Sequence, residues 1–378
     1  MASHKAPSGS RRNVLKTIGG LSVAGALAGC TGGSGGDGSG DTTESGGGST
    51  NTEGGSGGGM ESELSFDATM AIVAMEMSQI PSVTAMREML PAASDDRFTG
   101  SVRTFSGSTL AIQAMVSGSV DYYALSPGNV VQAQLAGNDL RVIATKVKGS
   151  DYVFAVQPDI NSIDQIVEEG RSVGIAGLGG ASHMQVAGIF LEEGYDPDTE
   201  VNIQQLGGSS TRTAAVASGK IDATIIHLDQ FAQIQNEGFE GKSLFEVREY
   251  FPNFINHTIT VPGAYLEDEA KRAHIEAYMT EFVKANKRAT EDFGWLYEKT
   301  QKYQSETLPE EDAKETWELN ANVLNAWPYK ESDFTKEDYE KQLTVLVGAG
   351  VLSKEDREKV DIDALVDTEI YANAIANL

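Results

Sequence analysis

The chain has almost no cysteine, because Cys30 is the only one in 378 residues. An internal disulfide is therefore impossible, and a cysteine-based metal cluster is excluded as well. Stability has to come from a hydrophobic core instead. The part of the chain that follows residue 63 is long enough to build two lobes of ordinary size.

Basic residues are also scarce, since 29 lysines and arginines stand against 55 acidic residues and the formal net charge is −26. So acidic a chain repels phosphate, and we expect no nucleic acid as a partner. In dilute salt the self-repulsion destabilises a compact state, whereas in molar salt the screening length falls to about 3 Å. The composition is similar to that of proteins from salt-loving archaea, and we expect the fold to need salt.

Long hydrophobic runs are missing, so no membrane-spanning helix is predicted. The longest candidate, residues 17–29, is short and rich in glycine. It follows a twin-arginine pattern, Ser-Arg-Arg-Asn-Val-Leu-Lys at 10–16, and ends in Leu-Ala-Gly before Cys30. This order is typical of an export signal, and its end resembles the lipobox of prokaryotic lipoproteins. We therefore predict a twin-arginine signal at 1–29 and a lipid anchor on Cys30 at the extracellular face of the cell membrane.

Residues 30–63 lack the apolar side chains from which a core is built. They are dominated by Gly, Ser, Thr, Asp, Glu and Asn. Such a composition has little apolar surface to bury, so it is typical of a flexible chain. We predict that this segment tethers a globular part to the membrane.

Two signatures of nucleotide chemistry are absent too. No Walker A sequence occurs, and the glycine-rich stretch at 177–182 departs from the Gly-x-Gly-x-x-Gly pattern at its last position. With Cys30 assigned to the lipid, no cysteine remains as a nucleophile. We expect neither an enzyme nor a cofactor.

Short strand-like and helix-like segments alternate in the rest of the chain. Strands are predicted at 68–73, 101–105, 120–125 and 141–147, with a helix at 110–115. This rhythm favours an open α/β sheet with right-handed crossovers. Amphipathic spacing predicts three further helices, at 267–298, 310–325 and 336–349.

An internal repeat with an offset of 101 residues is the most informative pattern. Phe-Ser-Gly-Ser at 105–108 aligns with Leu-Gly-Gly-Ser at 206–209. Ser-Gly-Ser-Val-Asp at 117–121 aligns with Ser-Gly-Lys-Ile-Asp at 218–222. Each copy reads as a strand, a Gly-Ser turn, a helix, a strand and a second helix. Two copies of one unit indicate two similar lobes that face each other.

These motifs carry a resemblance to a known family. The segment 106–129, with Ser-Gly-Ser followed by Ala-x-x-x-Gly-x-Val-Asp, resembles the solute-binding proteins of nitrate, sulfonate, taurine and thiamine-precursor importers. The resemblance implies a two-lobed α/β periplasmic-binding-protein type II fold, with a hinge and with C-terminal helices on the first lobe. It also implies a monomer that captures a small polar or anionic solute and delivers it to the permease and ATPase subunits of an ABC importer.

The lobe boundaries follow from the two places where we expect the chain to cross between lobes. These are near 146–151 and near 256–261. We predict lobe I at 64–147 and 258–378, and lobe II at 148–257. The two lobes are expected to close on the ligand around these crossings.

Candidate ligand-binding residues lie where a strand ends and a helix begins, because open α/β sheets bind ligands at the carboxyl ends of their strands. Glycine permits close approach of the backbone, helix N–H groups favour anions, and serine is suited to cap the helix. The candidates are Ser106, Gly107, Ser108, Ser126, Asn129, Ser182, His183, Ser209, Ser210, His227 and Asp229. Each serine also has a purely structural interpretation as a helix cap.

Three histidines, His183, His227 and His257, fall near the predicted crevice. A metal site, hydrogen bonding to the ligand and ordinary structure are all open for them, but their long spacing does not favour a metal. Arg103 and Arg212 could supply positive charge to a ligand or be solvated. The sequence leaves two alternative functions open, an accessory protein of a sensor or chemoreceptor and a secreted hydrolase on a related fold.

Overall fold

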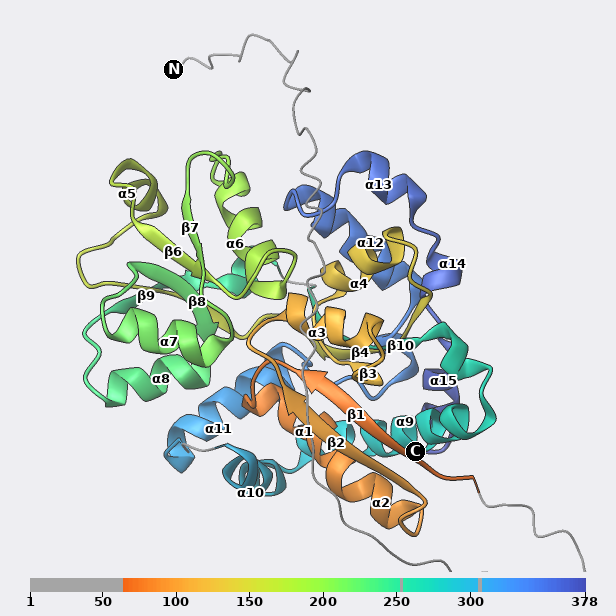
Figure 1. Ribbon diagram of the computed structural model, residues 1–378. Coiled ribbons are helices and arrows are strands. Elements are labelled where there is room, and N and C mark those ends of the chain that lie inside the picture. The colour runs from red at the N-terminus through yellow and green to blue at the C-terminus, as the bar shows by residue number, and fades with distance from the viewer. Residues whose placement is uncertain (1–63, 252–253, 305–307) are drawn as a thin grey trace, which may run out of the picture. The chain divides into compact units, whose positions relative to one another are not determined.

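Figure 1 shows the computed structural model, which describes residues 64–251, 254–304 and 308–378. The predicted signal at 1–29, the tether at 30–63 and the lipidation of Cys30 lie outside these residues and stay predictions. Residues 60–378 form one compact unit. No helix in the described part is long and apolar enough to cross a membrane.

The first of two five-stranded sheets has the strand order β2-β1-β3-β10-β4. Its strands are β1 (Phe66–Ile72), β2 (Phe98–Thr104), β3 (Tyr122–Tyr123), β4 (Leu140–Lys148) and β10 (Ile255–Pro262). The strand β1 pairs in parallel with β2 and β3, whereas β10 runs antiparallel to β3 and β4. The late strand β10 therefore brings the chain back between β3 and β4.

The second sheet repeats this arrangement in the order β7-β6-β8-β5-β9. Its strands are β5 (Tyr152–Val156), β6 (Ser172–Ile175), β7 (Asn202–Gln205), β8 (Ala223–His227) and β9 (Lys242–Glu246). Here β6 pairs in parallel with β7 and β8, and β5 runs antiparallel to β8 and β9. Two mixed sheets joined by helices confirm the predicted α/β fold class.

The 101-residue repeat of the sequence is also a structural repeat. Helices α3 (Ser108–Val116) and α4 (Pro127–Leu135) match α7 (Ser209–Ala217) and α8 (Leu228–Asn236) at both ends with the same offset. Gly118 and its counterpart Gly219 both adopt left-handed backbone angles, with φ of +73° and +70°. Only glycine adopts such angles without steric cost, which is why both copies keep Ser-Gly after the first helix.

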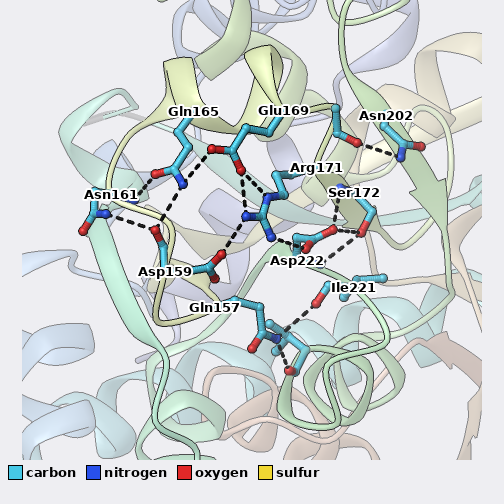
Figure 2. Close-up of polar contacts among 12 residues, drawn as sticks. Gln157, Asp159, Asn161, Gln165, Glu169, Arg171, Ser172, Asn202, Ile221 and Asp222 are labelled. Carbon is cyan, nitrogen blue, oxygen red and sulfur yellow. Dashed lines mark hydrogen bonds and ion pairs between the residues drawn. The ribbon is translucent and has the colours of Figure 1, made fainter.

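The aspartate that ends each Ser-Gly-x-apolar-Asp motif ties neighbouring strands together. The Asp121 carboxylate accepts a hydrogen bond from the Thr69 amide on β1 at 2.7 Å. In the second copy, the Asp222 carboxylate accepts from the Ser172 amide on β6 at 2.9 Å, as Figure 2 shows. The motif that reveals the repeat therefore has a structural role.

The other helices flank these units. They are α1 (Ile80–Thr84), α2 (Leu90–Ala93), α5 (Ile163–Glu168), α6 (Ala181–Glu192), α9 (Glu269–Glu291), α10 (Phe293–Tyr303), α11 (Glu310–Glu318), α12 (Lys336–Gly348), α13 (Lys354–Lys359), α14 (Ile362–Leu365) and α15 (Glu369–Ala376). Single 3-10 or π turns occur at Met77–Gln79, Ala85–Met89, Val247–Glu249, Gly263–Leu266, Leu319–Val323 and Glu331–Asp333.

Two of the three long helices predicted from amphipathic spacing are interrupted. The helix predicted at 267–298 breaks at Asp292, which leaves helical geometry and accepts a hydrogen bond from the Trp295 amide to start α10. The helix predicted at 310–325 ends as α-helix at Glu318 and continues as a π turn to Val323. Amphipathic spacing does not register a local cap of this kind, because the apolar period continues on both sides of it.

Each sheet has its own buried core. The first core joins Met70 of β1 to Tyr278 and Phe282 of α9, and the second joins Phe154 of β5 to Phe190 of α6. The strands of the second sheet all fall within 148–257, whereas β10 starts at Ile255 and crosses the predicted lobe boundary. The division into lobes I and II at these residues stays a prediction.

Candidate functional site

The glycine turns predicted to bind a ligand lie against one another. A Cβ atom added to Gly207 would be 2.8 Å from the Ser106 carbonyl oxygen. Ser106 and Gly207 occupy equivalent positions in the two copies of the repeat. A Cβ on Gly128 would be 2.7 Å from the Gly179 oxygen. The loops that follow the strands of the two sheets therefore meet, and glycine permits the close approach.

The serines at the starts of α3 and α7 do not cap these helices. The N-cap residues are Gly107 and Gly208, and neither Ser108 nor Ser209 makes a side-chain cap hydrogen bond. Their predicted role as caps is therefore wrong. Glycine supplies the N-cap backbone, and the Ser209 hydroxyl is turned instead to the carboxylate of Glu76.

The other predicted residues from the first copy and from α6 make contacts within and between the loops. The Ser126 hydroxyl donates to the Gly179 carbonyl at 3.2 Å. The Asn129 amide group accepts from the Tyr123 hydroxyl at 3.2 Å. The Ser182 hydroxyl accepts from the Ala176 amide at 2.8 Å, inside its own loop.

His183 is the remaining predicted residue of this loop. Its Nδ1 accepts a hydrogen bond from the Gly179 amide at 3.1 Å. Burial lowers the pKa of His183, so the ring is neutral near pH 7. A neutral ring that accepts from its own loop holds the glycine turn in place.

Three cavities in the described part of the chain involve predicted residues, and one of them, of about 590 Å³, is lined by Asn129. A second of about 330 Å³ is lined by Ser106 and Gly107 together with Gly177 and Gly207. A third of about 470 Å³ is lined by Ser210 and Asp229, among others. The predicted residues therefore do not converge on one cavity.

A buried charged cluster consists of Glu76, Asp151 and His227, and we call it the Glu76–His227 cluster. The Nδ1 atom of His227 lies 2.8 Å from the Asp151 carboxylate, and its Nε2 lies 3.4 Å from the Glu76 carboxylate. All three side chains are almost completely buried. Burial alone would lower the pKa of His227, but the negative charges of Asp151 and Glu76 offset this and hold that pKa well above its usual range. His227 is therefore a cation between two carboxylates.

Arg212 is the most unusual member of this region. It is only 1% exposed, and its Nε and Nη1 atoms have no hydrogen-bond partner in the described part of the chain. Its guanidinium carbon lies 6.0 Å from the centre of the Tyr152 ring, which in turn lies 4.3 Å from the His227 ring. Arg212 is therefore not solvated, and it keeps donors without acceptors inside the protein. Unpaired buried donors are costly, so they mark a place where an acceptor from outside can bind.

A second buried row lies beside the cluster, along the predicted crossing between lobes. The Lys146 ammonium donates to the Gln79 side-chain oxygen and to the Ala124 carbonyl, the latter at 3.2 Å. The Gln79 side-chain nitrogen donates to His257 Nδ1 at 2.9 Å. Burial lowers the pKa of Lys146 to about 7 and that of His257 well below its usual range.

The histidines do not form a metal centre in the part of the chain that the structure describes. There, no group of three or more His, Cys, Asp or Glu side chains is placed to hold a metal ion. His227 has carboxylate partners, His183 binds its own loop, and His257 accepts from Gln79.

Sequence reasoning missed most of the buried charges. Glu76, Lys146, Asp151 and Tyr152 were not among the predicted site residues, although Lys146 and Asp151 bound the predicted crossing near 146–151. Their spacing in the sequence does not point to a site. The only usable signal is position, since Glu76 follows β1 at its carboxyl end, where open α/β sheets bind ligands.

Residues 170–174 read Gly-Arg-Ser-Val-Gly, the spacing of a hydrolase nucleophile elbow. In the structure, however, Ser172 begins strand β6, whereas an elbow serine sits on a turn from a strand into a helix. Its hydroxyl donates to the Asp222 carboxylate at 2.6 Å, and Arg171 pairs with the same carboxylate (Figure 2). The motif is part of the strand-tying network, so it does not support the hydrolase alternative.

Comparison with known proteins adds the following. Residues 102–295 match the family model described as NMT1/THI5 like, which covers more than half of the chain. No curated protein matches the sequence.

Several solved structures share the fold. The periplasmic nitrate-binding protein of Synechocystis is 13% identical with a TM-score of 0.67, and the match covers 84% of this chain and 89% of that one. A ligand-binding component of an ABC-type import system from Staphylococcus aureus, with zinc bound, is 12% identical with a TM-score of 0.66, over 82% of this chain and 98% of that one. The alkanesulfonate-binding protein of Xanthomonas axonopodis, bound to MOPS, is 14% identical with a TM-score of 0.63, over 80% of this chain and 98% of that one. At these identities the likeness establishes the periplasmic-binding-protein fold.

Proposed function

The chain belongs to the NMT1/THI5-like family, and from this premise we propose that it is the extracytoplasmic solute-binding subunit of an ABC importer. It captures a small polar or anionic solute, of the nitrate, sulfonate, taurine or thiamine-pyrimidine precursor class, between two closing lobes. It then delivers the solute to the permease and ATPase subunits in the membrane. The protein acts as a monomer and as a receptor, without catalysis and without a cofactor.

The buried Arg212 is the observation that carries this proposal. A guanidinium group presents planar, paired N–H donors that match the oxygen atoms of nitrate, sulfonate or carboxylate. Two of its nitrogen atoms have no partner among the described residues, and Arg212 lies beside the Glu76–His227 cluster, where elements of both sheets meet. An anionic or strongly polar group supplied by a solute would satisfy them.

We assign the predicted glycine turns to the same solute, although Ser106 and Gly107 line one cavity and Ser210 lines another. Ser106–Ser108 and Gly208–Ser210 open helices α3 and α7, whose first N–H groups favour a negative or polar ligand. With Ser126, Asn129, Ser182, His183, His227 and Asp229, they form the proposed ligand-binding set. The contacts between these loops would tighten when the lobes close on a solute, as a differential stabilisation of the closed form requires.

We further propose that the protein is held on the extracellular face of the membrane by a lipid on Cys30. The support is the order of twin arginines, a short apolar stretch and Leu-Ala-Gly-Cys at the N-terminus. Replacement of Cys30 by alanine should release the exported protein into the medium. Retention of that variant in the membrane fraction would rule out the anchor.

Native mass spectrometry of the purified protein with its co-purified solute tests the central proposal. We expect one small molecule per chain, which is released unchanged on denaturation and whose re-addition raises the melting temperature. Ligand at about 100 times its Kd adds about 2.7 kcal/mol to the free energy of unfolding. Chemical conversion of the bound molecule, or failure of nitrate, sulfonates, taurine and pyrimidine precursors alike to stabilise the protein, would contradict the proposal.

A further inference from the structure

A cavity of about 470 Å³ lies between helices α7 and α8 on one side and Met75, Gln304 and Leu308 on the other. Its size falls within the range of about 300–1,000 Å³ that is common for small-molecule sites. The charged residues that line it are Asp229 and Glu237, and its lining includes no lysine, arginine or histidine among the described residues. The described lining of this cavity is therefore acidic.

Asp229 is the buried acid of this cavity. It is 5% exposed, and within the described residues it accepts one hydrogen bond, from the Gln230 amide to Oδ1 at 2.8 Å. No Lys, Arg or His nitrogen of the described residues lies within ion-pair distance of it, and the nearby charges are His227, Asp151 and Glu76. Since His227 already pairs with Asp151 and Glu76, Asp229 keeps a carboxylate oxygen without a donor. A buried carboxylate in this state is unfavourable unless a donor or cation binds it.

Two polar side chains that line the cavity with Asp229, those of Thr213 and Gln304, use their donors on backbone carbonyls. The Thr213 hydroxyl donates to the Ser209 carbonyl at 2.9 Å, and the Gln304 side-chain nitrogen donates to the Met75 carbonyl at 2.7 Å. The Gln304 side-chain oxygen therefore remains as an acceptor, and Gln304 lines the same cavity as Asp229. Acceptors that surround a buried acid select a ligand with donors.

We propose that this cavity binds an ammonium group, which pairs with Asp229 and donates to the neighbouring acceptors. The inference goes beyond the proposed function. Arg212 would bind a negative group, whereas this cavity would bind a positive one. The ammonium group can belong to the captured solute, which is then zwitterionic, or to a separate organic cation. The two sources share one chemistry, and titrations distinguish them.

Isothermal titration with ethylammonium, ethanesulfonate and taurine tests the ammonium and the anion site separately. Taurine carries both an ammonium and a sulfonate group, whereas ethylammonium carries only the first and ethanesulfonate only the second. Ethylammonium should bind, and Asp229→Asn should weaken this binding by at least about tenfold, as expected for a lost charge-assisted hydrogen bond. Glu240→Gln removes one exposed acid outside the cavity and should leave the affinity unchanged. Thermal unfolding of Asp229→Asn verifies that the variant is folded.

The pH gives a second readout. Burial raises the pKa of Asp229 to about 6, so the carboxylate is mostly protonated at pH 5 and mostly ionised at pH 7. Ethylammonium affinity should therefore rise by about tenfold between these pH values in the wild type and stay flat in Asp229→Asn.

The outcomes are distinct. Taurine that binds more tightly than both fragments, in a manner that depends on Asp229, assigns the ammonium to the solute. Ethylammonium that binds equally well with and without saturating ethanesulfonate assigns it to a separate cation. If no ammonium probe binds, or if its affinity is unchanged in Asp229→Asn, the proposal is overturned. Ethanesulfonate binding that persists in that case would leave the proposed function intact.

Discussion

The two copies of the repeat have the same scaffold and different chemistry. Helices α3 and α4 match α7 and α8 residue for residue at an offset of 101. Yet Ala111 of the first copy corresponds to Arg212 of the second, Ser126 corresponds to His227, and Gly128 corresponds to Asp229. The first copy contributes small residues where the second contributes buried charges.

This difference indicates a division of labour between the copies. The small residues of the first copy permit close approach, as at Gly128 beside the Gly179 carbonyl. The charged residues of the second copy supply the groups that we propose recognise a solute. A repeated fold can thus keep its backbone signals in both copies and concentrate its binding chemistry in one.

The equivalent residues Ser126 and His227 should differ most in the loss of stability when each is replaced by alanine. His227→Ala leaves the buried carboxylate of Asp151 without its ion-pair partner, and loss of one partner of a buried ion pair lowers the free energy of unfolding by about 3–5 kcal/mol. Ser126→Ala removes one neutral hydrogen bond, to the Gly179 carbonyl, and should lower it by about 0.5–1.5 kcal/mol. Chemical denaturation measures both values. Equal losses at the two positions would contradict the asymmetry.

Replacement of Gly207, whose turn lies against the equivalent residue Ser106, tests the contact between the two copies. Gly207 has a φ of +96°, and a Cβ there would also be 2.8 Å from the Ser106 carbonyl. The strain of a left-handed alanine alone lowers the free energy of unfolding by about 1–2 kcal/mol. Gly219→Ala is the matched control, because Gly219 has a φ of +70° and open space around it. Gly207→Ala should lose more stability than Gly219→Ala, and an equal loss would show that the two turns do not touch.

Asp229, whose equivalent in the first copy is Gly128, should make stability depend slightly on pH. Burial raises the pKa of Asp229 to about 6 from its usual 3.8. Between about pH 4 and 6 the folded protein therefore holds a proton that the unfolded chain has lost, so stability falls as the pH rises through this window. Asp229→Asn should remove this part of the slope of the melting temperature against pH. A slope that stays unchanged in the variant would place the titrating group elsewhere.

The sequence predicts the repeated parts of the fold well, because they depend on local backbone signals. The Ser-Gly turns and the aspartates at 121 and 222 recur with fixed spacing, and the structure shows why: they set left-handed turns and tie strands. The break at Asp292 was not predictable from amphipathic spacing, since a single capping side chain interrupts a helix without changing its apolar period.

The candidate site was predicted only in part. Loops at the ends of strands pointed to Ser209 and His227, which do meet at Glu76. Glu76 comes from a segment far from Lys146 and Asp151 in the sequence, and only the tertiary fold brings it to them. The burial of Arg212 likewise has no signature in the sequence, because its neighbours on α7 are ordinary helix residues.

Replacement of Arg212 by methionine tests the central claim most directly, with solute affinity and unfolding free energy measured on the same samples. Two buried nitrogen atoms of Arg212, Nε and Nη1, have no partner in the described part of the chain, so removal of this side chain should leave stability unchanged or raise it. Solute affinity should fall by at least about tenfold, the effect of a lost charge-assisted hydrogen bond. A variant that loses stability and binds solute normally would show that Arg212 holds the fold and not the solute.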